Sequence, residues 1–218
     1  MLTINFPSIT LIWYKCKGEN QMKQRNLRAG DMALIGMFAA LMAVGANITS
    51  MAPFLQVAGI PLSLQPFFCL LAAMLLGARR AAIAMTVYAL AGLAGAPIFA
   101  QFSAGFAPFI GKSGGFILAY IPAAFAAGWL LEKTKEPGRL HYAWASLIGT
   151  AVIYIIGTTY TYIALKLWLH APISYGMAWF YMIWFFIKDI ILALLLASIA
   201  PAVYRSVHKA TGFNRNPA

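Results

Sequence analysis

The amino-acid sequence predicts an all-α integral membrane protein, a six-transmembrane-helix bundle with both termini cytoplasmic. Hydrophobic residues make up 62% of the 218 residues and charged residues only 10%, whereas about a quarter of a soluble domain is charged. The apolar residues form long uncharged runs and lack the alternating pattern of membrane β-barrel strands. Lysines and arginines gather between these runs. This composition excludes a soluble fold, a disordered chain and a disulfide scaffold.

The first three spans are expected within residues 32–98. Residues 32–78 carry no charge, which leaves room for two helices and a turn, because one span needs about 20 apolar residues. Pro53, Gly59 and Pro61 indicate the position of the turn. Arg79 and Arg80 then separate the second span from the third. The expected spans are residues 32–51, 62–78 and 81–98.

The last three spans follow the same pattern. The polar segment Glu132–Arg139 separates the fourth span from the fifth, and the sixth contains Lys188 and Asp189 in otherwise apolar sequence. The expected spans are residues 114–131, 142–165 and 178–204. Residues 31–204 then form the membrane domain, between a basic N-terminal tail (1–30) and a C-terminal tail (205–218). Within the first tail, residues 1–21 are interpreted as an upstream extension or an interfacial segment.

The basic residues predict the orientation. If both termini lie on one side, thirteen of the 16 lysines and arginines lie on that side, whereas Lys112 and Lys166 lie opposite and Lys188 lies within a span. Because cytoplasmic loops carry the excess of basic residues, both termini are expected in the cytoplasm. The net charge of +11 is thus a topology signal and a surface for anionic lipid headgroups. Nucleic-acid binding is not predicted.

Asp189 is the strongest candidate for a functional residue, because a carboxylate inside a bilayer must be paired, protonated or directed into a cavity. A purely structural ion pair or snorkelling towards the interface is the alternative. Lys188 precedes it, but consecutive helical residues point about 100° apart, so the two need not pair. Lys188 instead shares a helix face with Tyr181 and Trp184, a spacing compatible with a cation–π contact.

The segment of residues 96–115 is rich in Gly and Phe and uncharged except for Lys112. A lid over a cavity and an interfacial loop on lipid headgroups both explain this composition. Gly111-Lys112-Ser113 resembles the end of a phosphate-binding loop, but Phe106 stands where that motif requires glycine. A nucleotide site is therefore rejected, and Lys112 is a candidate partner for a ligand carboxylate.

Other polar groups in apolar runs are weaker candidates. Gln65 offers two donors and an acceptor to a urea-like or amide-like group, although a structural glutamine explains it equally well. The candidates for lining a cavity are Tyr88, Tyr120, Tyr160 and Tyr162, although for each alone membrane packing is the better explanation. Small residues recur every four positions in the first and fourth spans, a pattern for internal packing or for docking of another membrane protein. The sequence lacks hydrolase and metal motifs, so binding and translocation fit better than catalysis.

A specific series of motifs lies between residues 60 and 125. It comprises Pro61-x-x-x-Gln65, Gly77-x-Arg79-Arg80, Tyr88, Gly92-Leu93-x-Gly95-x-Pro97, Phe99, Gly111-Lys112-Ser113-Gly114-Gly115-Phe116 and Pro122-Ala123-Ala124. This series resembles the BioY-type biotin transporters, which are substrate-binding (S) components of energy-coupling factor (ECF) vitamin transporters. The resemblance covers roughly residues 30–200.

The resemblance implies a six-helix protein in the cytoplasmic (inner) membrane of a prokaryote that binds biotin from outside, in a cavity capped by two loops. It implies a transmembrane T protein and two ABC ATPases as partners, and these ATPases bind ATP. This chain itself is not expected to be an enzyme or to need a cofactor or metal. The expected substrate-binding residues are Gln65, Tyr88, Gln101, Lys112, Ser113, Tyr120, Lys188 and Asp189. The expected docking surface is Gly36, Ala40 and Ala43.

Two positions depart from the family pattern. Lys112 replaces the usual proline of the glycine-rich loop, and Leu192 stands where a lysine usually follows Asp189 by three residues. We therefore expect Lys112 to meet the biotin carboxylate, while Asp189 and Gln65 meet the ureido ring and Tyr88 covers it. A solitary carrier, an S component for another small vitamin, and a membrane-embedded binding or scaffold protein without transport remain the alternatives.

Overall fold

The computed structural model describes residues 29–48, 56–57, 60–134, 136–168 and 173–211. The predicted extension (1–21), most of the N-terminal tail and the turn at Pro53 and Gly59 lie outside the described residues. The chain divides into two units, residues 1–32 and 33–218. The described part of the first unit is only the opening turn of a helix, so the description that follows concerns the second unit.

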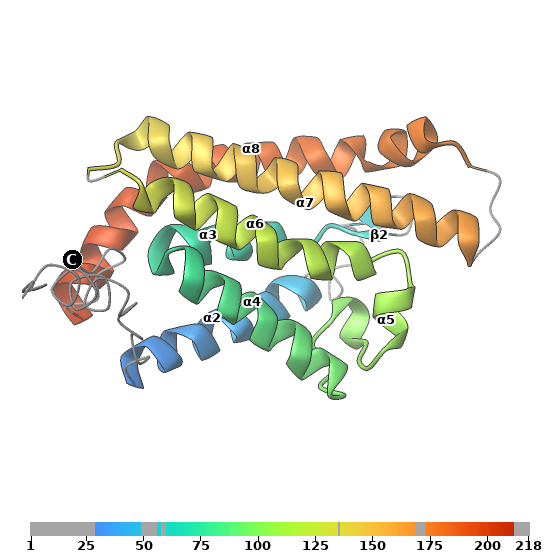
Figure 1. Ribbon diagram of the computed structural model, residues 1–218, viewed down its shortest axis with the longest axis horizontal. Helices are drawn as coiled ribbons and strands as arrows, with labels where there is room; N and C mark the ends of the chain where they lie inside the picture. Colours follow the sequence, from blue (N-terminus) through green and yellow to red (C-terminus); the bar gives the residue numbers. More distant parts are fainter. Residues whose placement is uncertain (1–28, 49–55, 58–59, 135, 169–172, 212–218) are drawn as a thin grey trace, which may run out of the picture. The chain divides into compact units, whose positions relative to one another are not determined.

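The described residues are mainly helical, as predicted (Figure 1). The helices in this part are α2 (Ala29–Asn47), α3 (Gln65–Leu76), α4 (Ala78–Leu93), the short 3-10 helix η1 (Ala100–Phe102), α5 (Ala107–Ile110), α6 (Gly114–Glu132), α7 (Arg139–Leu167) and α8 (Tyr175–Thr211). Two strands of two residues each, β1 (Gln56–Val57) and β2 (Ile60–Pro61), pair antiparallel.

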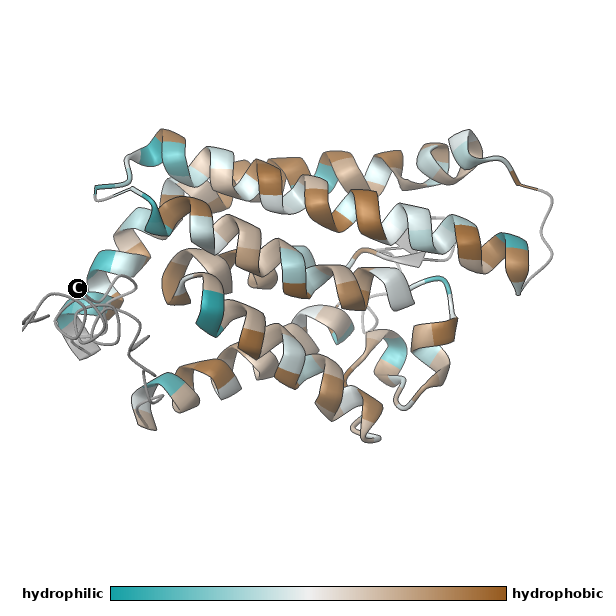
Figure 2. Ribbon diagram, viewed as in Figure 1, coloured by the Kyte–Doolittle hydropathy of each residue, from teal (hydrophilic) through white to brown (hydrophobic). Residues whose placement is uncertain are grey.

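Four described helices, α2, α6, α7 and α8, are long and apolar enough to cross a membrane. Hydrophobic residues run along much of α6, α7 and α8, and hydrophilic residues gather at the turn between α6 and α7 (Figure 2). α8 continues through Pro201 to Thr211, past the predicted limit at residue 204. The length and composition of these helices therefore suit a lipid bilayer.

The second and third predicted spans are shorter than expected. α3 has 12 residues and α4 has 16, both below the roughly 20 residues of a typical span. Gly77 separates them with φ 83° and ψ 177°, a backbone conformation that only glycine adopts without strain. The break thus lies before Arg79 and Arg80, which belong to the first turn of α4 and do not separate the helices.

α6 lies between α7 on one side and α3 and α4 on the other (Figure 1). Its small residues Ala119, Ala123 and Ala127 are fully buried, so this stripe serves internal packing. Close approach is required at Gly128, where a Cβ would lie 2.4 Å from the backbone nitrogen of Ala78. In lipid no hydrophobic effect holds helices together, so the close van der Waals packing that small residues permit contributes to their association.

Gly128→Ala should destabilise the protein, because the added methyl group meets the backbone of α4 and not a flexible side chain. Overpacking of this kind costs about 1–3 kcal/mol, which lowers the Tm by at least about 2 °C in a chain of this size. Gly36→Ala is the matched control, since nothing lies within 4 Å of its Cβ position. Thermal unfolding in detergent measures both, and equal Tm values for the two variants would contradict the close contact.

Candidate functional site

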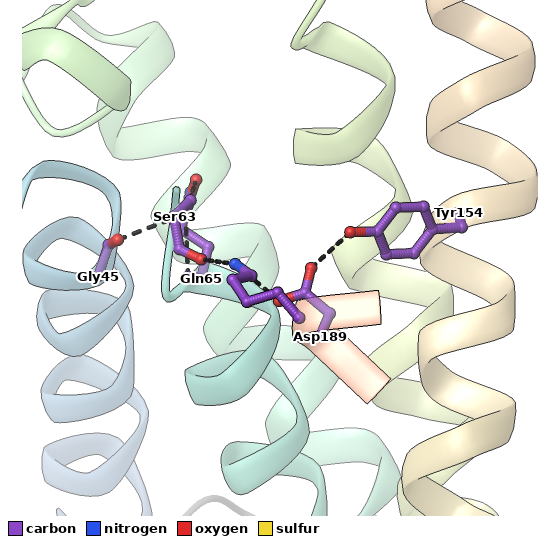
Figure 3. A network of polar contacts seen from close by, with 6 residues as sticks. Gly45, Ser63, Gln65, Tyr154 and Asp189 are labelled. Carbon is purple, nitrogen blue, oxygen red and sulfur yellow. Dashed lines mark hydrogen bonds and ion pairs between the residues drawn. The ribbon is translucent and has the colours of Figure 1, made fainter. Parts of the chain in front are cut away.

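Asp189 lies in the middle of α8 and is only 4% exposed. The Tyr154 hydroxyl of α7 donates a hydrogen bond of 2.6 Å to its Oδ2 (Figure 3). The Lys188 Nζ lies 2.8 Å from Oδ1 as an ion pair, and among the described residues Oδ1 receives no further hydrogen bond. The carboxylate is therefore paired, as its position in an apolar helix requires, and still has free acceptor capacity.

Lys188 pairs with Asp189 although the two residues are consecutive. Helical geometry does not demand this contact, but the flexible four-carbon stem of lysine allows the ammonium group to reach back. The same Nζ donates a hydrogen bond to the backbone carbonyl of Ser63. Lys188 thus connects α8 to the residues that precede α3.

Gln65 begins α3, and the proline that follows it is compatible with the first turn of a helix. Its Oε1 accepts a hydrogen bond of 3.0 Å from the Ser63 hydroxyl, and its Nε2 donates one of 2.8 Å to the Tyr88 hydroxyl of α4. The Ser63 hydroxyl also lies 3.3 Å from the carbonyl oxygen of Gly45 in α2 (Figure 3). Both Gln65 and Tyr88 are buried.

These contacts form one buried polar network that joins α3, α4, α7 and α8. It brings together four predicted site residues: Gln65, Tyr88, Lys188 and Asp189. It also contains Ser63 and Tyr154, which sequence reasoning missed. The backbone carbonyl of Ser63 accepts the hydrogen bond from Lys188, and every residue has such a carbonyl. Tyr154 is one of ten tyrosines. Neither residue therefore carries a distinctive sequence signal.

The other four predicted site residues lie elsewhere. Tyr120 is buried in α6, where its backbone carbonyl accepts a weak hydrogen bond from the Cys69 thiol. Gln101 is exposed in η1. Lys112 and Ser113 are exposed directly before α6, and the Thr161 hydroxyl of α7 donates a 2.7 Å hydrogen bond to the Lys112 carbonyl. The side chains of Lys112 and Ser113 are therefore exposed where α6 begins, next to the C-terminal part of α7.

The segment that joins α4 to α6 covers the network at Tyr88. Phe99 is only 1% exposed, and its ring packs edge-on against Tyr88 at 5.4 Å and against Phe109 at 5.5 Å between ring centroids. Gly92 makes this possible, because a Cβ there would lie 2.1 Å from the Phe99 ring. The ring of Phe99 is therefore turned inward over Tyr88, whereas Phe102 and Phe106 of the same segment are exposed.

A separate groove of about 420 Å³ lies among α5, α6 and α7. Its lining side chains are Phe106, Phe109, Ile110, Leu118, Tyr160 and Trp168. A lining of this kind offers one phenol and one indole but no charged group, so it cannot recognise a polar ring and a carboxylate together. The buried network, which holds a carboxylate, an ammonium and an amide, is the better candidate for a specific ligand site.

The network can exchange hydrogen bonds with a small polar molecule. It offers acceptors on Asp189 and donors on Gln65 and Lys188 within an apolar bundle, where each such bond counts for more than in water. Within the described residues, no group of three or more His, Cys, Asp or Glu side chains could hold a metal ion. The arrangement therefore suits recognition of a ligand with alternating donors and acceptors.

Comparison with known proteins gives concordant matches. A family model described as "BioY family" matches residues 20–209. The chain is 77% identical to the putative biotin transporter BioYB of Bacillus subtilis (strain 168) over 195 residues, covering 89% of this chain and 98% of that relative. It is 32% identical to the biotin transporter BioY of Thermotoga maritima over 168 residues, covering 74% and 90% of the two chains.

The fold also matches a solved structure, the crystal structure of the S-component for biotin from an ECF-type ABC transporter. The TM-score is 0.68 at 20% identity, over 83% of this chain and 94% of that chain. Identity at this level establishes a shared fold. With a family model that matches residues 20–209 and a relative that is 77% identical over 195 residues, this chain belongs to the BioY family of transport proteins, which are not enzymes.

Proposed function

We propose that this chain captures biotin with high affinity at the outer face of the cytoplasmic (inner) membrane of a prokaryote, as the S component of an ECF-type transporter. The observation that carries the proposal is the ion pair between the half-buried Lys188 and the buried Asp189, with its hydrogen-bonded connection through Ser63 to Gln65 and Tyr88. Its setting is a chain whose relatives are named biotin transporters.

The chemistry of biotin fits this network. Its ureido ring carries two N–H donors and one carbonyl acceptor. Asp189 accepts from the ureido N–H groups, because its Oδ1 is occupied only by the lysine ion pair. The Gln65 amide donates to the ureido oxygen, and Tyr88 covers the ring. Tyr120, which is buried in α6, contributes to the apolar wall of the proposed site.

The carboxylate of the biotin side chain requires a different partner. Lys188 is already neutralised by Asp189, whereas the side chain of Lys112 is exposed and its backbone is held by Thr161. We assign Lys112 to the carboxylate. Gln101 and Ser113, which are also exposed on the segment between α4 and α6, supply neutral hydrogen bonds to the same end of the ligand.

The proposed topology has six membrane crossings and cytoplasmic termini, with residues 31–204 as the membrane domain. α3 and α4 are the two short crossings, about 18 and 24 Å long at 1.5 Å per residue. The chain before α3 completes the first of them. Thirteen of the 16 basic residues then lie on the cytoplasmic side, next to anionic lipid headgroups, in agreement with the positive-inside rule.

The proposed partners are a transmembrane T protein and two ABC ATPases, which bind the ATP; this chain itself uses no cofactor. α2 offers the docking surface. Gly36 and Ala40 are exposed on it and Ala43 is half-buried. Small residues at four-residue spacing allow a second helix to approach closely, and the resulting van der Waals packing is one of the forces that drive helix association in a membrane.

Asp189→Asn should raise the Kd for biotin by more than about tenfold, or 1.4 kcal/mol. The amide cannot accept from the ureido ring as a carboxylate does, and it leaves the Lys188 ammonium unpaired. Isothermal titration calorimetry on purified protein measures the change. Glu136→Gln removes an exposed carboxylate and should leave the Kd unchanged. An unaltered affinity of Asp189→Asn would remove Asp189 from the biotin site.

Lys112→Ala should weaken the binding of biotin much more than that of biotin methyl ester, because only the free acid carries the charge that the lysine meets. A competition assay with both ligands measures the difference. Lys166→Ala is the control, since Lys166 is an exposed lysine whose Nζ bonds to the Tyr162 hydroxyl instead. Equal losses for both ligands would show that another group meets the carboxylate.

Ala40→Leu should abolish co-purification of this chain with the co-expressed T protein and ATPases, because the larger side chain keeps the helices apart. Ala94→Leu makes the same change at an exposed position at the end of α4 and should preserve the complex. Quantitative pull-down from membranes compares the two variants. Biotin uptake by the chain alone under nucleotide depletion would instead favour a solitary carrier.

A further inference from the structure

We propose that Asn47 is a positioning residue that holds the cover segment (residues 98–103) closed over the buried polar network and so limits the rate at which a bound ligand leaves. The effect on ligand release rests on the proposed function. Closure of the cover segment is a property of this chain that can be measured without any ligand.

Asn47 is the last residue of α2, and its side chain is buried. Its Oδ1 accepts a hydrogen bond of 2.7 Å from the backbone N–H of Phe102. Its Nδ2 donates to the carbonyl oxygens of Ile98 at 3.3 Å and of Ala43 at 3.0 Å. One amide side chain therefore ties the end of a membrane helix to both ends of the cover segment.

The cover segment has a conformation that needs such support. Gln101 and Phe102 have φ values of 58° and 54°, a left-handed region that non-glycine residues seldom occupy. Strained backbone persists only where the surroundings hold it, and it often accompanies function. A bridge between Phe99 and Ser103 closes the loop internally, and Asn47 holds the residue at which the chain reverses.

The cover segment rests directly on a predicted binding residue. The carbonyl oxygen of Ile98 accepts a hydrogen bond from Asn47 and also lies 3.3 Å from the Tyr88 hydroxyl. That hydroxyl in turn accepts a hydrogen bond from Gln65. The buried ring of Phe99 packs against the same tyrosine. A ligand bound beneath Tyr88 at the proposed site is covered by this segment, so the hydrogen bonds between the segment and α2 oppose release.

The dissociation rate of biotin tests the effect on the ligand. Purified protein loaded with labelled biotin is chased with an excess of unlabelled biotin. Asn47→Ala removes all three side-chain hydrogen bonds without adding bulk, and should speed dissociation by about tenfold or more. Val44→Ala, an exposed position on the same helix, should have no effect.

Thiol labelling tests closure without ligand. Ser103→Cys, in a Cys16→Ser background, places a thiol in the half-buried cover segment, and a membrane-impermeant maleimide reports its access. Asn47→Ala should raise the labelling rate at position 103. Cys69 is fully buried in α3 and reports global unfolding, so its labelling should stay unchanged.

The proposal is overturned if Asn47→Ala leaves both the dissociation rate and the labelling at position 103 unchanged. It is also overturned if Cys69 becomes labelled in parallel, because the effect is then general destabilisation. If the wild-type protein binds no biotin, the proposed function fails, and the labelling rates alone decide whether Asn47 holds the cover segment.

Discussion

Burial of Asp189 in an apolar helix is the constraint on which the arrangement of this protein depends. A carboxylate removed from water needs compensating charge and hydrogen bonds, and a lone one would be strongly destabilising. Asp189 obtains them from Lys188 and from Tyr154 of α7. Because the lysine is itself held by the Ser63 carbonyl, the requirement extends to the start of α3. One acidic residue thereby sets how three elements meet.

Close packing of helices allows this polar network to remain sheltered. Without a hydrophobic driving force in lipid, helices associate through van der Waals contact and interhelical hydrogen bonds. Glycines permit the closest contacts: a Cβ at Gly149 would lie 2.4 Å from Leu70, and one at Gly115 would lie 2.2 Å from Tyr160. Close packing thus sets the distances between helices. The polar network requires that the faces carrying Asp189 and Tyr154 meet.

Hydropathy and charge predict the long helices well, because α6 and α7 differ from the expected spans by only a few residues. The break predicted at Arg79 and Arg80 lies two residues after the observed one at Gly77. The helix is interrupted there by a glycine backbone conformation, which a hydropathy pattern does not reveal. Asp189 and Gln65 stand out as polar groups in apolar runs. Asn47, Ser63 and Tyr154 do not, because their partners Phe102, Lys188 and Asp189 lie far away in sequence, and the contacts of Asn47 and of Ser63 with these partners use backbone groups common to every residue.

α2 connects the proposed docking surface to the proposed ligand site. Gly36 and Ala40 are exposed on it, while the carbonyl of Gly45 lies near the Ser63 hydroxyl and Asn47 bonds to the cover segment. At 1.5 Å per residue, Gly36 and Asn47 lie about 16 Å apart along this one helix. In the proposed transporter, a partner that displaces α2 would therefore release the cover and disturb Ser63, whose carbonyl anchors Lys188, at the same time. Docking and ligand release would be coupled through one helix, with no need for a longer pathway through the bundle.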